Sequence, residues 1–179
     1  MLMKLLQKEK EMKTSFKDAM NFIFKWEGGF VNDPRDNGGM TYKGICRRLY
    51  PKLKVWDIVD DLLKSNTSIK EINKALSLCN DKEIRDIYYN NYWNPCNCDN
   101  LKYPLDIIAF DAAVNMGVKR SKEFLEGTND PCKVIQRRVD YYKKIVQKNP
   151  VQECFLKGWL NRVKSLCDEC NVSKEYIDF

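Results

Sequence analysis

Residues 26–45 read WEGGFVNDPRDNGGMTYKGI, and this stretch decides the fold because a helix ends and a glycine-rich loop begins within it. Upstream, apolar residues recur at helical spacing from Phe16 to Trp26, until two glycines interrupt the run. We therefore predict a helix that ends at Glu27. Residues 28–44 contain too many glycines and turn-forming residues for a helix, so they predict a loop or a short hairpin.

Glu27 stands at the end of this predicted helix, next to Trp26 and before the glycine-rich loop. Burial beside an aromatic ring disfavours the charged form of a carboxyl, and so does the partial negative charge at a helix C-terminus. A carboxyl that stays protonated near neutral pH can donate its proton to the departing oxygen of a glycosidic bond. Glu27 is therefore a candidate general acid, although an isolated Glu-Gly-Gly is more commonly a solvated helix end.

Beyond this stretch the sequence predicts more helices and little sheet. Pro104 precedes a nearly all-apolar helical run that stops at Gly117, and this run predicts the central buried helix. The other predicted helices begin at Asp81, at Asp130-Pro131 and at Pro150, with a further candidate over residues 65–79. The predicted fold class is mainly α, with a small Gly-rich loop or hairpin.

The composition is that of a soluble globular protein. A chain of 179 residues with 44% hydrophobic and 31% charged residues fits one compact domain. It has no run of about 18 apolar residues, so we expect no stable membrane insertion. Residues 1–14 lack the apolar core of a secretion signal, which predicts an N-terminal extension on a protein made in the cytoplasm without a signal peptide. The net charge of +6 favours an anionic partner, either nucleic acid or a bacterial wall.

The eight cysteines could be free, disulfide-bonded or bound to a metal. In a protein of the cytoplasm we expect free, mostly buried thiols. Cys96 with Cys98 and Cys167 with Cys170 could instead bind one zinc ion as four thiolates, but the first pair is spaced more tightly than usual. We therefore predict no metal and no cofactor.

Four motifs distributed over most of the chain carry a family resemblance. The first is Glu-Gly-Gly at residue 27, followed over residues 33–45 by Asp-Pro-x-Asp-x-Gly-Gly-x-Thr-x-x-Gly-Ile. The others are IYYNNYW at residues 87–93, FDAAVNMG at residues 110–117 and KGWLNRV at residues 157–163. Together they resemble glycoside hydrolase family 108 over about residues 16–166. That family comprises N-acetylmuramidases, including phage endolysins and proteins once described as secretion activators.

The resemblance implies a lysozyme-like helical domain with its glycine-rich loop or hairpin beside the active-site cleft. Residues 15–104 resemble the catalytic region of the family. Residues 105–179 resemble the region catalogued in the family as a predicted peptidoglycan-binding domain. We expect these C-terminal helices to pack into the same globule and to complete its core.

The resemblance also implies catalytic roles. The order Glu27, Asp36, Thr41 is similar to the Glu, Asp, Thr triad of phage-type lysozymes, although the loop before the threonine is one residue shorter here. It implies that Glu27 is the catalytic acid and that Asp36 and Thr41 position the attacking water. Asp33 is an alternative to Asp36, although Asn-Asp-Pro is commonly a turn.

Other polar and aromatic residues are candidates for binding the substrate. Asp111 and Asn115 lie four residues apart and share a helix face, where either a sugar or a buried network could supply their partners. Tyr42 is a candidate for stacking on a sugar ring, and Gln136 for facing the cleft. Two tryptophans are instead expected in the core: Trp93 and Trp159.

These observations predict a monomeric peptidoglycan hydrolase that cleaves the β-1,4 bond between N-acetylmuramic acid and N-acetylglucosamine. We expect an endolysin or prophage-derived enzyme that reaches the cell wall, in the periplasm or outside the cell, after release by a holin. A non-catalytic wall-binding or secretion-accessory protein is the alternative, and the intact Glu27 and Thr41 weigh against it. A nucleic-acid-binding domain would explain the charge but leave the glycine-rich motif unexplained, so we expect no nucleic-acid partner. The stereochemical outcome stays open, because it depends on the distance between the carboxylates.

Overall fold

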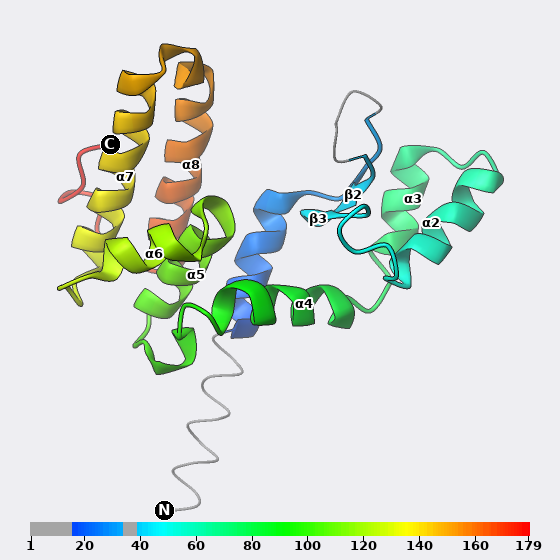
Figure 1. The fold of residues 1–179 in the computed structure, drawn as a ribbon, viewed down its shortest axis with the longest axis horizontal. Coiled ribbons are helices and arrows are strands. Elements are labelled where there is room, and N and C mark those ends of the chain that lie inside the picture. Colours follow the sequence, from blue (N-terminus) through cyan, green and yellow to red (C-terminus); the bar gives the residue numbers. More distant parts are fainter. Residues whose placement is uncertain (1–15, 34–38) are drawn as a thin grey trace, which may run out of the picture. The chain divides into compact units, whose positions relative to one another are not determined.

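The computed structural model describes residues 16–33 and 39–179 (Figure 1). Its contacts divide the chain into two compact units. Residues 24–33 with residues 39–87 form one of them, which we call the small unit, and residues 16–23 with residues 88–179 form the other, the large unit. Residues 88–104 belong to the same unit as the C-terminal helices.

The first helix covers residues 16–27, which confirms the predicted end of this helix. In the large unit the ring of Phe16 lies 5.2 Å from both Tyr89 and Trp93, edge to face in each case. The last turn of the helix, residues 24–27, belongs to the small unit. The sequence predicted this helix correctly because its apolar residues have helical spacing and glycines follow it.

A small antiparallel sheet follows, which confirms the predicted hairpin. Its strands, in the order β1-β2-β3, are β1 (Phe30–Val31), β2 (Thr41–Tyr42) and β3 (Ile45–Cys46). Lys43 and Gly44 connect β2 to β3, with φ angles of 47° and 74°. A two-residue turn with positive φ at both positions suits the right-handed twist of the flanking strands.

The small unit also contains α2 (Val55–Lys64), α3 (Ile69–Leu76) and most of α4 (Lys82–Tyr88). Helix α3 begins with a capping box, in which Ser68 accepts from the backbone N–H of Glu71 and the Glu71 side chain accepts from that of Ser68. Helix α2 was not predicted. Its N-cap residue, Lys54, makes no side-chain capping bond, so the start of the helix has no local sequence signal.

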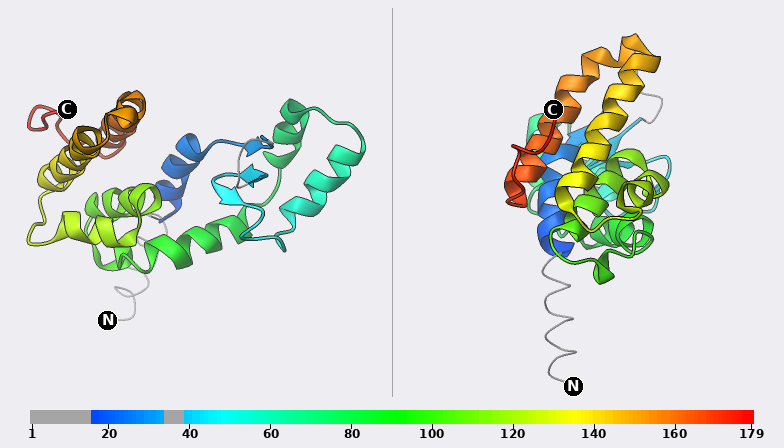
Figure 2. Two further views of the ribbon diagram at one scale, coloured as in Figure 1. Left: turned by 45° about the horizontal axis from the view of Figure 1, so that its top comes forward. Right: turned by 90° about the vertical axis from the view of Figure 1, so that its left-hand side faces the viewer.

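In the large unit, α4 continues directly into a π-helix, η1 (Tyr89–Trp93), and a 3₁₀ turn, η2 (Cys98–Asn100), follows. The remaining elements are α5 (Leu105–Met116), α6 (Val118–Leu125), α7 (Pro131–Lys148), a second 3₁₀ turn, η3 (Pro150–Gln152), and α8 (Glu153–Glu169). Helix α5 is the central buried helix, as predicted, and contacts α6, α7, η1 and η2. Helices α7 and α8 lie side by side (Figure 2).

The fold is mainly α, as predicted. Asp130 caps α7 by accepting from the Cys132 N–H at 2.9 Å, and Pro131 occupies its first turn. Helix α6 was not predicted, because only Ser121 and Phe124 are buried in a segment otherwise rich in charge. None of the helices described by the structure is both long and apolar enough to span a membrane.

Candidate active site

Glu27 is the last residue of the first helix, and its side chain is half-buried. The chain leaves the helix through Gly28, which has a φ of 71°. This left-handed conformation is common just after a helix and favours glycine, because a Cβ there would clash with the backbone. Phe30, in β1, is only 1% exposed, so the segment after Glu27 enters the core of the small unit within three residues.

Asn73 of α3 holds the start of β1 by hydrogen bonds in both directions. Its side-chain Oδ1 accepts from the Phe30 N–H at 2.6 Å, and its Nδ2 donates to the Phe30 carbonyl at 3.0 Å. The same Nδ2 lies 3.1 Å from the Ile69 carbonyl in its own helix. No local pattern in the sequence marks Asn73, because it and Phe30 are 43 residues apart along the chain.

Thr41 lies on β2, opposite Val31 of β1 and Cys46 of β3, and is half-buried. The strand that carries Thr41 is therefore paired with the strand that follows Glu27 by three residues. Asp33 lies just after β1 and is half-buried. Asp36 falls outside the residues that the structure describes.

Tyr42 occupies the core of the small unit instead of an exposed surface. Its side chain is 2% exposed, and its hydroxyl lies 3.1 Å from the Leu76 carbonyl and 3.4 Å from Oδ1 of Asp81. Burial raises the pKa of Tyr42 well above its usual value, and the nearby Asp81 carboxylate adds to this effect. Tyr42 thus belongs to the core of the small unit, and its stacking on a sugar stays a prediction.

The turn between β2 and β3 is tied to the helix that ends at Glu27. Lys43, in that turn, pairs with Asp81, and its ammonium lies 4.3 Å from the ring centre of Phe24. The guanidinium of Arg85 lies 5.1 Å from the same ring. Phe24 is one helical turn before Glu27, so these cation–π contacts help to hold the end of the helix in the small unit.

Asp111 of α5 belongs to a buried ion network in the large unit. It has no exposed surface, and its carboxylate accepts from Nη1 of Arg138 at 2.6 Å and from Nε and Nη2 of Arg162 at 2.9 and 2.8 Å. Burial alone would raise the pKa of Asp111, but the two guanidinium groups lower it below its usual value. Of the two kinds of partner considered for Asp111, the structure shows the buried network.

Asn115 and Gln136 also have partners within the large unit. Oδ1 of Asn115, an exposed residue, accepts from the Tyr142 hydroxyl at 2.5 Å. Gln136 donates to Asp140 at 2.8 Å and accepts from the backbone N–H of Asp178 at 2.7 Å. Gln136 therefore joins α7 to the C-terminal segment.

The two tryptophans expected in the core differ in burial. Trp93 is fully buried, as predicted, and its indole N–H donates to Asp99 at 2.7 Å. Trp159 is half-buried and stacks on Tyr142, at 5.0 Å, and on Phe155, at 6.0 Å. Phe155 itself is 54% exposed, so this stack of rings reaches the surface of the large unit.

None of the eight cysteines, all of which the structure describes, forms a disulfide, and four of them are buried: Cys96, Cys98, Cys167 and Cys170. Burial raises the pKa of Cys167 to about 11 and that of Cys170 to about 12. A hydrogen bond from Cys98 lowers the pKa of Cys96 to about 7, against the opposing effect of burial. Within the described part of the chain, no group of three or more His, Cys, Asp or Glu side chains is arranged to hold a metal ion.

Comparison with known families identifies the kind of enzyme to which this site belongs. Residues 20–117 match the family model described as Glycosyl hydrolase 108, which is more than half of the chain. The chain belongs to glycoside hydrolase family 108. The matched region includes Glu27 and the β1–β3 sheet. Membership makes the protein a glycoside hydrolase and supports a function of the peptidoglycan-hydrolase kind.

A solved structure supports the same fold. The chain is 23% identical to the protein in "Structure of Brucella abortus SagA", with a TM-score of 0.59. The similarity covers 91% of this chain and 97% of that one, so it includes both units. A comparison with curated proteins gave no match.

Proposed function

We propose that this member of glycoside hydrolase family 108 is an N-acetylmuramidase that cleaves the β-1,4 bond between N-acetylmuramic acid and N-acetylglucosamine in bacterial peptidoglycan. The observation that carries the proposal is the position of Glu27. This half-buried carboxyl ends the first helix, precedes the glycines that connect it to β1, and lies within the region that matches the family.

In this mechanism Glu27 donates its proton to the glycosidic oxygen while the bond from that oxygen to the anomeric carbon breaks. Water then adds its oxygen to the anomeric carbon and gives up one proton to a carboxylate of the site, so that the glycan ends in a new reducing sugar; proton exchange with solvent returns both carboxyl groups to their starting forms. Asp36 and Thr41 hold that water, with Asp33 as the alternative to Asp36. Thr41 suits this role because β2, its strand, pairs with β1 in the small unit that also contains Glu27.

The products of purified peptidoglycan test the bond that is cleaved. We expect mass spectrometry of the soluble fragments to find N-acetylmuramic acid at the new reducing ends. Reducing ends of N-acetylglucosamine would instead make the protein a glucosaminidase. The absence of any new reducing end would favour the non-catalytic wall-binding protein.

Glu27→Gln tests the catalytic acid. The amide has nearly the same size as the carboxyl and cannot supply the proton, so we expect at least a ~10³-fold loss of turnover with an unchanged melting temperature. The matched control is Glu153→Gln, which alters an exposed glutamate in the first turn of α8 and should leave turnover unchanged. Near wild-type activity of Glu27→Gln would place the acid elsewhere.

Asp36→Asn and Asp33→Asn separate the two candidates for holding the water. Asp36 has the nine-residue spacing from Glu27 found in the phage-type triad, whereas Asp33 precedes Pro34, which favours a turn. We expect Asp36→Asn to lower turnover about 10²-fold and Asp33→Asn to lower it much less, with little change in melting temperature. The opposite order would assign the water to Asp33.

A further inference from the structure

We propose that Asn73 is a positioning residue for Glu27, and that Gly29 is a glycine because the Asn73 side chain occupies the place of a Cβ. The inference rests on the proposed role of Glu27 as the catalytic acid. Asn73 thereby has a function, although it lies on α3 and outside the glycine-rich loop.

The two hydrogen bonds between Asn73 and Phe30 are those that a neighbouring strand would make. One carboxamide accepts from the Phe30 N–H and donates to the Phe30 carbonyl, at 2.6 and 3.0 Å. Strand β1 has only two residues, and the Asn73 side chain makes the hydrogen bonds that the backbone of a further strand would make with it. It therefore fixes both the position and the orientation of the peptide groups around Phe30.

Asn73 is itself held in place. It lies on α3, whose first turn is closed by the capping box of Ser68 and Glu71, and its Nδ2 is 3.1 Å from the Ile69 carbonyl. Ile72, next to Asn73, is fully buried in the small unit. A helix with a capped end and a buried face provides a rigid support for the carboxamide.

The two glycines after Glu27 are required for different reasons. Gly28 has a φ of 71°, at which any Cβ is strained against its own backbone, but a Cβ built on it would meet no atom outside the adjoining residues within 4 Å, so its requirement is conformational. Gly29 does not have a positive φ, but a Cβ built on it would lie 2.0 Å from Oδ1 and 2.9 Å from Cγ of Asn73. Its requirement is therefore steric, and Asn73 alone imposes it.

This arrangement connects α3 to the catalytic carboxyl over a short path. Phe30 is three residues from Glu27, and the intervening glycines have no side chains to restrict the chain. Glycines leave the backbone flexible, so an external contact must define the path by which it leaves the helix. A catalytic group displaced by about 1 Å can lose about 10²-fold in rate, so the clamp on Phe30 matters for turnover.

A double-mutant cycle on Gly29 and Asn73 tests the proposal. We expect Asn73→Ala and Gly29→Ala each to lower kcat by about 10- to 100-fold, with KM changed less than about twofold. In the double variant the clash is absent, so adding Gly29→Ala to Asn73→Ala should change kcat by less than about twofold. Asn73→Asp keeps an acceptor for the Phe30 N–H and should retain more activity than Asn73→Ala.

All variants are assayed at least about 10 °C below their own melting temperatures, so that the unfolded fraction does not lower kcat. The control is Asn161→Ala, which changes an exposed asparagine on α8 and should leave kcat unchanged. The proposal is overturned if folded Asn73→Ala keeps its full kcat, or if Gly29→Ala is equally harmful with and without Asn73.

Glu27→Gln, measured in the same series, separates this inference from the proposed function. If Glu27→Gln remains active, the catalytic assignment fails, and the positioning role fails with it. If Glu27→Gln is inactive while Asn73→Ala is fully active, only the positioning role is lost.

Discussion

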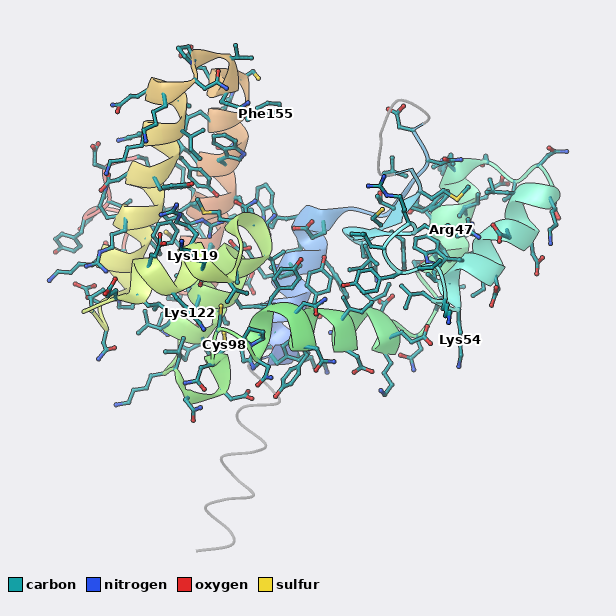
Figure 3. All side chains as sticks on the ribbon, viewed as in Figure 1. Arg47, Lys54, Cys98, Lys119, Lys122 and Phe155 are labelled. Carbon is teal, nitrogen blue, oxygen red and sulfur yellow. The ribbon has the colours of Figure 1, made fainter. Side chains whose placement is uncertain are left out.

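The two units of the molecule are stabilised by different kinds of polar contact. The large unit buries a charged network of Asp111 with Arg138 and Arg162. Asp111 lies on α5, the central helix, most of whose residues are buried. The small unit has short elements joined by bonds from side chains to backbone, such as those from Asn73 to Phe30. Arg47 of the small unit, labelled in Figure 3, pairs with Asp60. Both of these side chains are partly exposed.

The difference separates stability from catalysis. A buried charge is costly to leave unpaired, so removing one member of the network should strongly lower the free energy of unfolding of the large unit. A partly exposed ion pair contributes little to the free energy of unfolding, because water solvates the remaining charge when its partner is removed. Of the proposed catalytic residues that the structure describes, Glu27 and Thr41 lie in the small unit.

The largest expected effect concerns Asp111. Asp111→Ala leaves two guanidinium groups buried without their carboxylate, so we expect the free energy of unfolding to fall by about 3–5 kcal/mol. Urea denaturation monitored by circular dichroism measures this change. Replacing the whole network with apolar residues, in Asp111→Leu/Arg138→Met/Arg162→Met, should recover much of the loss. A loss below about 1 kcal/mol in Asp111→Ala would remove the contrast between the units.

A smaller effect is expected from alkaline pH, through Cys170 of the large unit. The unfolded thiol loses its proton near pH 9, whereas burial raises the pKa of the folded thiol to about 12, so the unfolded state binds fewer protons in this range. Stability should therefore fall as pH rises, by about 2 kcal/mol between pH 9 and pH 11 from this group.

Thermal unfolding of wild type and Cys170→Ala across this pH range measures the contribution of the thiol. The variant should show a shallower decline than wild type. Cys154→Ala, at an exposed cysteine, provides the control and should leave the slope unchanged. Equal slopes for wild type and Cys170→Ala would show that this thiol is not protected from ionisation in the folded state.

The smallest effect is expected at Asp60 in the small unit. Its carboxylate accepts from both Nη atoms of Arg47, at 2.6 and 2.7 Å, and these bonds lower the pKa of Asp60. The two side chains are 31% and 39% exposed, so Asp60→Asn should cost less than about 1 kcal/mol. Urea denaturation at low and high salt checks this, because salt should reduce the difference between variant and wild type. A cost comparable to that of Asp111→Ala would show that exposure does not distinguish the two ion pairs.

The sequence alone was sufficient for the features that depend on neighbouring residues. The helix that ends at Glu27, the buried α5 and the start of α7 at Asp130 and Pro131 follow from apolar spacing, glycine and capping residues. The turn at Lys43 and Gly44 is equally local. These signals lie within a few residues of the element that they specify, so one chain is enough to detect them.

Only the tertiary structure decided which polar groups meet. Asp111 is paired with arginines 27 and 51 residues away, and Asn73 with a backbone 43 residues away. From the sequence, Asp111 was equally suited to a sugar or to a buried network, and Tyr42 was a candidate for stacking on a sugar. Side-chain chemistry specifies that a buried polar group needs a partner, but the folding of the chain determines which partner is near. The same reason explains Gly29, whose requirement for glycine arises from an asparagine on another helix.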